Sequence, residues 1–334
     1  MTWVRRASCA TCVSSNTESV GDLRDRPRVV SLLPSATEIV HFAGAGDALV
    51  GVTHECDYPP GVETLPRLTS TPIDPHSMTS AEIDVAIGEH LTDTGSIYSL
   101  DVKLLGELKP DLILTQGICD VCAVSLGIVE QAAARLPKTP RVLSMNPVSL
   151  DGVLDATVEV GDAVGRGAEA RTKVAALRER LARVEETVAG LPRSHVGCIE
   201  WLDPPFSAGH WVPEMVRFAG GEELFAEAGE PSERLAWREV FEAAPEVLVL
   251  MPCGFDASRA AREAGVLPGL PGWVDLPAVK DGRVWAVDAN SHFSRPAPRL
   301  VEGVEILARL LHPEAFSDVP EPGDAVRFDI TARR

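Results

Sequence analysis

The stretch that decides the fold is residues 28–38, which read RVVSLLPSATE. Residues 28–33 are rich in apolar residues and include two β-branched valines, which predicts a short buried strand. Ser35 and Glu38 follow with the spacing of a capping box, which predicts a helix that opens at Ser35 and runs to about Ala43. A buried strand that passes at once into a helix is the repeating unit of α/β proteins.

The same alternation of strands and helices continues along the chain. A second capping box, Thr79 with Glu82, opens another helix. The further predicted strands cover residues 49–53, 112–115, 141–145, 196–199, 247–251 and 284–287. The further predicted helices cover residues 100–108, 125–135, 213–219, 237–243, 256–263 and 296–311. Strands that alternate with helices favour parallel sheets and an α/β class.

One long helix is predicted over residues 151–188, with Gly165 and Gly167 as a kink or a break. Its apolar stripe consists of Val174, Leu177, Leu181, Val184, Val188 and Leu191. We therefore expect two Rossmann-like lobes joined by this helix, with a ligand cleft between the lobes; a single continuous sheet is the alternative. The expected division is a disordered tail (1–26), an N-terminal lobe (27–150), the connecting helix (151–190), a C-terminal lobe (191–312) and a C-terminal tail (313–334).

Charge and composition exclude several classes of protein. The 334 residues carry 31 Lys and Arg against 49 Asp and Glu, a formal net charge of −18, which argues against a nucleic-acid partner. No apolar run is long enough for a transmembrane helix, so membrane insertion is not expected. Residues 1–26 lack the apolar stretch of a secretory signal, which predicts a cytoplasmic protein with reduced thiols. The role of Cys9 and Cys12 is left open.

Short catalytic signatures are missing from the sequence. There is no dinucleotide-binding glycine motif after a strand, no phosphate-binding P-loop, no G-x-S-x-G and no H-E-x-x-H. Their absence argues against a hydrolase, a dehydrogenase or an NTPase, and the protein we expect is a binder and not an enzyme.

Polar and aromatic residues follow the predicted strands, where open α/β sheets bind their ligands. The candidate ligand-binding residues are Tyr58, Glu200, Trp201, Phe206, His210, Trp211, His292 and Arg295. Trp201, Phe206 and Trp211 would form a flat apolar wall for a planar ligand, and a local apolar core is the alternative. The planar guanidinium groups of Arg295 and Arg299 suit carboxylates or phosphate.

The candidate metal site consists of His54, Cys56, Cys119 and Cys122. Both sulfurs of Cys119-x-x-Cys122 can reach one ion, and His54 and Cys56 complete a ligand set that suits zinc. The same thiols could also ligate a cobalt or iron centre, form a redox dithiol, or simply be packed under a loop. A zinc enzyme with Glu200 as acid or base is the catalytic alternative.

Several stretches carry a family resemblance. They are residues 28–38, 108–114 (LKPDLIL), 209–214 (GHWVPE), 219–221 (AGG), 288–291 (DANS) and 294–299 (SRPAPR). Over residues 28–311 the chain resembles the cobalamin-type periplasmic substrate-binding proteins of the iron-chelate and cobalamin class. Cys119 and Cys122 are typical of a cysteine-bearing subgroup without a signal peptide.

The resemblance implies two lobes that hold a ligand non-covalently between them. It implies a corrinoid, with cobalamin as the leading ligand, against Trp201, Phe206 and Trp211 and against Tyr58 of the first lobe. Heme or a ferric chelate is the alternative ligand for the same fold. An ABC permease is the implied partner if an export signal lies upstream.

Overall fold

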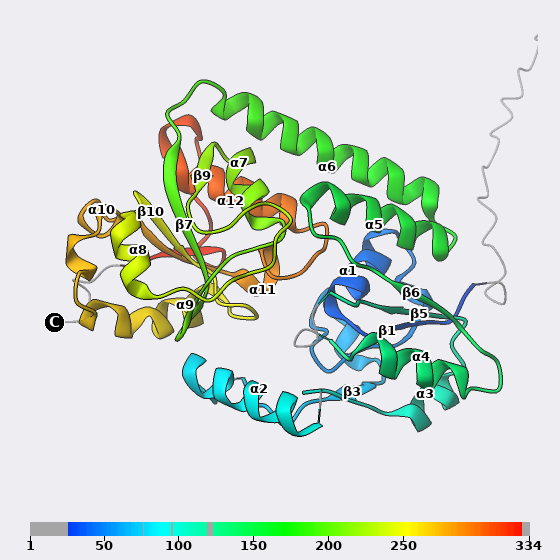
Figure 1. Ribbon diagram of the computed structural model, residues 1–334. Coiled ribbons are helices and arrows are strands. Elements are labelled where there is room, and N and C mark those ends of the chain that lie inside the picture. Colours follow the sequence, from blue (N-terminus) through cyan, green and yellow to red (C-terminus); the bar gives the residue numbers. More distant parts are fainter. Residues whose placement is uncertain (1–25, 76, 95, 119–122, 329–334) are drawn as a thin grey trace, which may run out of the picture.

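The computed structural model describes residues 26–75, 77–94, 96–118 and 123–328. It shows two α/β lobes, so the predicted class is confirmed (Figure 1). The sheet of the first lobe is parallel, in the order β2-β1-β5-β6. Its strands are β1 (Val29–Ser31), β2 (Leu49–Gly51), β5 (Leu112–Thr115) and β6 (Arg141–Ser144). Apolar clusters bury both of its faces, as a parallel sheet requires.

The second lobe contains a mixed sheet in the order β12-β11-β10-β7-β8, and β9 also pairs with β7. Strands β9, β7, β10 and β11 run parallel, whereas β8 and β12 run antiparallel to their neighbours. The strands are β7 (Ser194–Leu202), β8 (Pro205–Ser207), β9 (Gly221–Glu223), β10 (Val247–Leu250), β11 (Val284–Val287) and β12 (Ala325–Arg327). The sequence does not predict β8, β9 and β12, because these strands of 3 residues, unlike β1 and β2, do not lie in a longer apolar run.

Helices cover the sheets and connect the strands. They are α1 (Pro34–Phe42), α2 (Ser80–Thr94), α3 (Val102–Leu108), α4 (Leu126–Ala134), α5 (Leu150–Ala163), α6 (Gly167–Val188), α7 (Val212–Phe218), α8 (Trp237–Ala243), α9 (Ala257–Glu263), α10 (Pro277–Lys280), α11 (Ala289–His292) and α12 (Leu300–Leu311). Within the described ranges, no helix has the length and apolar character needed to cross a membrane.

The connection between the lobes is a pair of helices, α5 and α6, with a break in the region where the sequence predicts a kink or a break (Figure 1). The chain turns at Gly165, whose φ of 75° favours glycine, close to where a break was expected. Leu150 at the start of α5 packs in the core of the second lobe, and Val160 further along packs in the first. Helix α6 returns along the same path, and its stripe of Val174, Leu177, Leu181, Val184 and Val188 is buried in the second lobe. Both helices therefore bridge the lobes.

The two predicted capping boxes have different outcomes. Thr79 and Glu82 form one, since Thr79 N donates to Glu82 Oε2 (2.8 Å) and Glu82 N donates to Thr79 Oγ1 (3.3 Å). The box at Ser35 and Glu38 is wrong: α1 begins at Pro34, and the buried Ser35 hydroxyl has no hydrogen-bond partner among the described residues. Proline at the first helical position already removes one N–H group that a cap would satisfy. The side chain of Glu38 reaches the second lobe instead.

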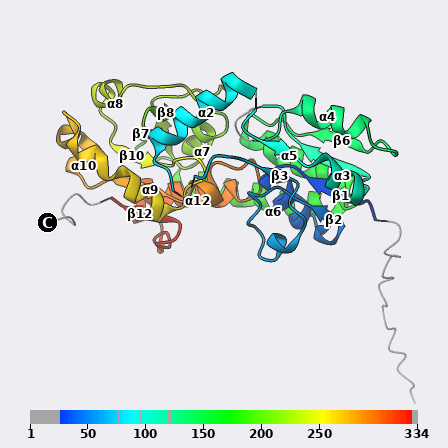
Figure 2. The same ribbon diagram turned by 90° about the horizontal axis from the view of Figure 1, so that it is seen from below.

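Helix α2 lies against the second lobe, although in sequence it falls within the first lobe (Figures 1 and 2). It is flanked in sequence by β3 (Thr69–Ser70) and β4 (Ser99–Leu100), which pair with each other. Ile83 of α2 shares an apolar cluster with Phe255 of the second lobe, and Trp201 packs against that cluster. The sequence does not predict this contact between the lobes.

Candidate functional site

The first contact between the lobes is a cluster of charged side chains. Glu38 of α1, which is 3% exposed, accepts hydrogen bonds from Arg299 Nε (2.9 Å) and Nη2 (2.6 Å) and from Arg295 Nη1 (3.2 Å). Arg295 also donates to both carboxylate oxygens of Asp57. We call Glu38, Asp57, Arg295 and Arg299 the latch. Paired, charge-assisted hydrogen bonds of this kind fix the orientation of the groups that they join.

The latch holds the loop that follows β2. Asn290 Nδ2 donates to Asp57 Oδ2 (3.0 Å), which adds a further bond between the lobes. Burial alone would raise the pKa of Asp57, but the hydrogen bonds and positive charge of Arg295 outweigh burial and lower it. The guanidinium of Arg299 lies 4.0 Å from the ring centre of Tyr58, which is 41% exposed. Tyr58 and Arg295, both predicted to contact a ligand, therefore lie at the boundary between the lobes.

Glu55 lies between the latch and Tyr98. Tyr98 Oη donates to Glu55 Oε1 (3.1 Å), and the Glu55 carbonyl oxygen accepts a long hydrogen bond from Arg295 Nη2 (3.4 Å). Burial raises the pKa of Glu55, while the bond from Tyr98 and the charge of Arg295 oppose the rise. Glu55 and Asp57, two residues apart, thus have pKa values shifted in opposite directions.

The second contact between the lobes joins α2 to the hairpin of β7 and β8. Trp201 and Phe206 are cross-strand partners in this hairpin, so their side chains share a face. Trp201 Nε1 donates to the carbonyl oxygen of Ser80 in α2 (3.2 Å), and its ring meets Phe255 edge-on at 5.6 Å between centres. The guanidinium of Arg234 lies 5.6 Å from the ring centre of Phe206. Two of the three aromatic residues predicted to form a wall therefore lie together, beside α2.

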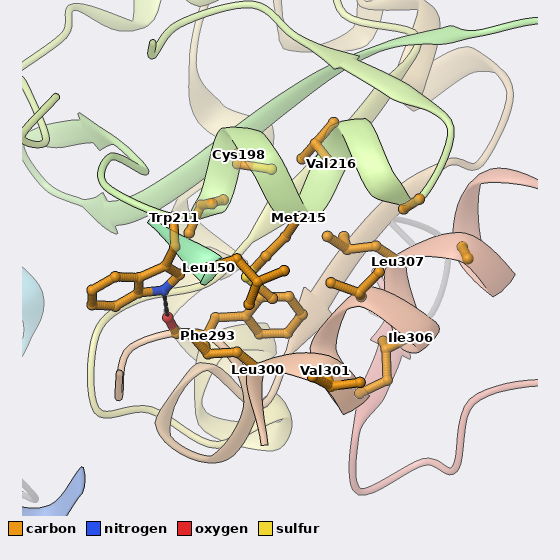
Figure 3. Close-up of a cluster of buried hydrophobic side chains, with 14 of the residues drawn as sticks. Leu150, Cys198, Trp211, Met215, Val216, Phe293, Leu300, Val301, Ile306 and Leu307 are labelled. Atoms are coloured by element: carbon orange, nitrogen blue, oxygen red, sulfur yellow. Dashed lines mark hydrogen bonds between the residues drawn. The ribbon is translucent and has the colours of Figure 1, made fainter. Parts of the chain in front are cut away.

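The third aromatic residue, Trp211, is not part of this pair. It is 8% exposed and packs with Met215 and Phe293 in the core of the second lobe (Figure 3). Its Nε1 donates to the carbonyl oxygen of Phe293 (2.7 Å). His210 has a φ of 54° and its ring lies beside Trp211, and burial lowers the pKa of His210. For Trp211 the structure thus matches the alternative of a local apolar core.

Two further candidates lie elsewhere in the second lobe. His292 is buried, with Nε2 3.3 Å from Asp324 Oδ1 and Nδ1 3.8 Å from Glu302 Oε2. These carboxylates belong to the C-terminal segment and to α12, and neither lies in the first lobe. Glu200 precedes Trp201 where the register between β7 and β8 shifts, and its carbonyl oxygen accepts from Cys253 N (3.0 Å). A role of His292 or Glu200 toward a ligand stays a prediction.

The candidate metal site is described only in part. His54 Nδ1 and Thr69 Oγ1 are 2.8 Å apart, and burial is the main cause that lowers the pKa of His54. Cys56 is buried, with its sulfur 3.1 Å from a threonine hydroxyl of α1. Cys119 and Cys122 lie outside the described residues. In the part of the chain that the structure describes, no three His, Cys, Asp or Glu side chains are placed to hold an ion.

The sequence analysis missed Glu38, Ser80 and Glu263 as residues that join the lobes. The spacing from Ser35 to Glu38 predicts a capping box and so conceals the role of Glu38. Ser80 and Glu263 are 183 positions apart, a pairing that no local pattern reveals. Arg295 and Arg299 gave a signal in the sequence, because guanidinium groups suit carboxylates. In the structure these carboxylates belong to the protein itself.

The protein has two lobes with central parallel strands, and a helix pair bridges them. The lobes also contact each other through the loops after their strands. This arrangement is that of a two-lobed binding protein. The chain belongs to the periplasmic binding protein family, whose model matches residues 29–290. The resemblance drawn from the sequence is therefore confirmed.

Individual relatives agree with this assignment. The chain is 25% identical over 283 residues to a vitamin B12-binding protein of Vibrio vulnificus, covering 83% of this chain and 87% of the relative. It is 24% identical over 303 residues to an uncharacterized ABC transporter substrate-binding lipoprotein of Bacillus subtilis, covering 88% and 83% of the two chains. The solved structure of a periplasmic heme-binding protein from Pseudomonas aeruginosa is similar with a TM-score of 0.67 at 20% identity, covering 90% of this chain and 99% of that one.

The family decides two of the predictions. Its members are binding proteins of ABC transport systems and not enzymes, as predicted for this chain. The prediction of a cytoplasmic protein is wrong, because the family and these relatives are described as periplasmic or as lipoproteins, which work outside the cytoplasm.

Proposed function

We propose that the protein binds a corrinoid, with cobalamin as the leading ligand, between its lobes and presents it to an ABC permease. The single observation that carries the choice of ligand is the likeness to a vitamin B12-binding protein across most of both chains. The corrinoid ring is broad and largely apolar, so it needs flat apolar side chains at the boundary between the lobes.

The Trp201–Phe206 pair supports this choice. Both rings lie on one face of the β7–β8 hairpin. Tyr58 and Arg295 lie at the same boundary, on the side of the latch, and would meet the edge of a bound ring. Four candidates rank lower: His210, Trp211, His292 and Glu200. Within the second lobe, Trp211 bonds to Phe293, His292 lies beside Asp324 and the ring of His210 lies beside Trp211. The candidates for a ligand to cobalt, zinc or iron remain Cys119, Cys122, Cys56 and His54.

An absorbance titration of the protein with hydroxocobalamin tests the proposal. We expect saturable one-to-one binding, and a Phe206→Ala variant with a Kd about tenfold higher, because truncation of an aromatic anchor costs about 1–2 kcal/mol. Phe316→Ala is the matched control, since that ring also lies under an arginine, Arg309 at 5.8 Å, but on the C-terminal segment. The control should bind like the wild type.

The outcomes that contradict the proposal are distinct. Unchanged spectra, together with no retention of cobalamin on gel filtration, would exclude it as the ligand. A saturable spectral change with hemin in the same experiment would then favour heme, the ligand named for the structure from Pseudomonas aeruginosa. Equal Kd values for Phe206→Ala and Phe316→Ala would place the ligand away from the hairpin.

A further inference from the structure

Helix α2 and the two residues before it, Met78–Thr94, form what we call the arm. We propose that the arm is a displaceable cover of the ligand site: in the ligand-free protein it lies on the Trp201–Phe206 hairpin, and a ligand reaches these rings only after the arm has moved away. The inference rests on the proposed function for the identity of the ligand. The movement of the arm itself can be tested without any ligand.

The arm covers the Trp201 ring, on which a planar ligand would pack. The hydrogen-bonding edge of the Trp201 indole is taken by the carbonyl oxygen of Ser80 (3.2 Å). Ile83 belongs to an apolar cluster with Phe255, and Trp201 packs against the same cluster. The ring therefore has its apolar and polar partners inside the protein. A planar ligand that packs on Trp201 must replace these partners, so the arm and the ligand compete for one surface.

Several polar contacts with the second lobe secure the start of the arm. Glu263 of α9 accepts hydrogen bonds from Ser80 N (2.6 Å) and from Ser80 Oγ (2.9 Å). Arg259 Nη2 donates to the carbonyl oxygen of Met78 (3.1 Å), and an ion pair joins Arg234 to Asp84 (3.0 Å). Both side chains of that pair are partly in water, with 59% and 33% exposed, so the pair contributes little.

Beyond its first turn the arm rests on apolar contacts of partly buried side chains, since Ala86, Ile87 and Leu91 pack against the cluster of Ile83 and Phe255. Val85, on the helix just beyond its first turn, is 59% exposed. Gly88 weakens the middle of the helix relative to alanine, and a Cβ built there would meet nothing within 4 Å in the described part of the chain. The stem that ties the arm to the first lobe is the β3–β4 pair, with two residues in each strand. Such a short ladder is marginal by itself and does little to fix the position of the arm. The arm can therefore leave the second lobe while the covalent chain on either side still tethers it to the first.

Hydrogen exchange of the ligand-free protein tests whether the arm detaches. A detached helix of this length is marginal in water, so its amides exchange each time the arm leaves. We expect α2 amides to exchange about tenfold or more faster than those of α1, and Glu263→Gln to speed α2 about tenfold further, because it removes a charge-assisted acceptor. Arg238→Gln is the matched control, since it breaks an exposed ion pair with Glu242 in the same lobe and touches no part of the arm.

The outcome in the free protein decides the inference in either direction. Acceleration of α2 by Glu263→Gln, with α1 unchanged and no response to Arg238→Gln, supports a cover that opens locally. Equal exchange of α1 and α2, or no response of α2 to Glu263→Gln, would overturn it.

Stopped-flow binding of hydroxocobalamin then separates the cover from the proposed function. If the arm must leave before binding, the association rate in Glu263→Gln rises several-fold and that in Arg238→Gln does not, since binding scales with the open fraction. Equal rates in the two variants would mean that the arm does not block entry, which would overturn the inference and leave cobalamin binding intact. Absence of any binding would reject cobalamin alone, and the exchange data would still decide the movement of the arm.

Discussion

The two lobes meet at the latch and at the arm, and the two contacts use different chemistry. The latch joins Glu38 and Asp57 to Arg295 and Arg299 through directed, charge-assisted hydrogen bonds, and Glu38 is almost wholly buried. The arm rests on an apolar cluster around Ile83, with polar contacts at its first turn.

This difference assigns different tasks to the two contacts. A buried ion pair tolerates little displacement, because a charge left unpaired in the interior is costly. Apolar contact is non-directional and roughly proportional to area, so another apolar partner of similar area can replace it. The latch is therefore suited to hold the lobes in one orientation, and the arm is suited to exchange its contact for a ligand.

Glu38→Ala should have the largest effect on the protein. It leaves the guanidinium groups of Arg295 and Arg299, whose side chains are only 10% and 15% exposed, without their shared carboxylate, so we expect a loss of about 3–5 kcal/mol in the free energy of unfolding. Urea denaturation followed by circular dichroism measures this loss. Glu242→Ala is the control, because its ion pair with Arg238 lies in solvent and should be worth less than about 0.5 kcal/mol. Similar losses in the two variants would show that the latch is no stronger than a surface pair.

A matched pair of isoleucines compares the arm directly with the core of the first lobe. Ile39 of α1 is fully buried and Ile83 of α2 is 5% exposed, so by burial alone each change to alanine would cost about 2–5 kcal/mol. If the arm can leave the second lobe, the loss in Ile83→Ala cannot exceed the free energy that holds the arm in place. We expect less than half the loss of Ile39→Ala in urea denaturation, together with faster exchange of α2 amides. Equal losses would mean that the arm unfolds only with the rest of the protein.

The sequence predicts the central strands well because they are buried on both faces. Residues 112–115 and 284–287 are nearly continuous apolar runs, and their predicted bounds match β5 and β11. The start of α2 is also predicted, because its capping box is a local pattern. The position of α2 in space is not predictable in this way. It depends on Glu263 and Phe255, which lie far along the chain in another lobe.

The candidate site shows the same limit. The rule that ligand residues follow parallel strands picks out Trp201 and Phe206, and the planar guanidinium group picks out Arg295. The structure places all three where the lobes meet. The same rule picks out Trp211, which the structure buries in the core, because spacing in sequence does not tell which way a loop side chain turns. The spacing from Ser35 predicts that Glu38 caps a helix, but its carboxylate binds Arg295 and Arg299 instead.

The smallest expected effect is a difference in pH dependence between the two contacts. Arg295 holds the pKa of Asp57 below its ordinary value against the effect of burial. The stability that Asp57 contributes is therefore fully present above about pH 4, its unfolded pKa, and is lost as the pH falls through its lower folded pKa. The side chain of Asp57 is 52% exposed, so solvent screens this contribution. Urea denaturation at pH steps from about 6 to about 2.5 measures it.

Asp57→Asn should flatten this acid loss, whereas Asp84→Asn, which breaks the exposed ion pair of the arm, should lose stability as steeply as the wild type. Glu55 acts in the opposite direction: its pKa is raised, so its contribution is present below its unfolded pKa and is lost as the pH rises through the folded value. Removal of Asp57 therefore leaves a neighbour whose effect favours the folded state in acid. If Asp57→Asn and Asp84→Asn instead show the same slope below pH ~4, the acid response does not come from the latch, and the electrostatic contrast between the two contacts fails.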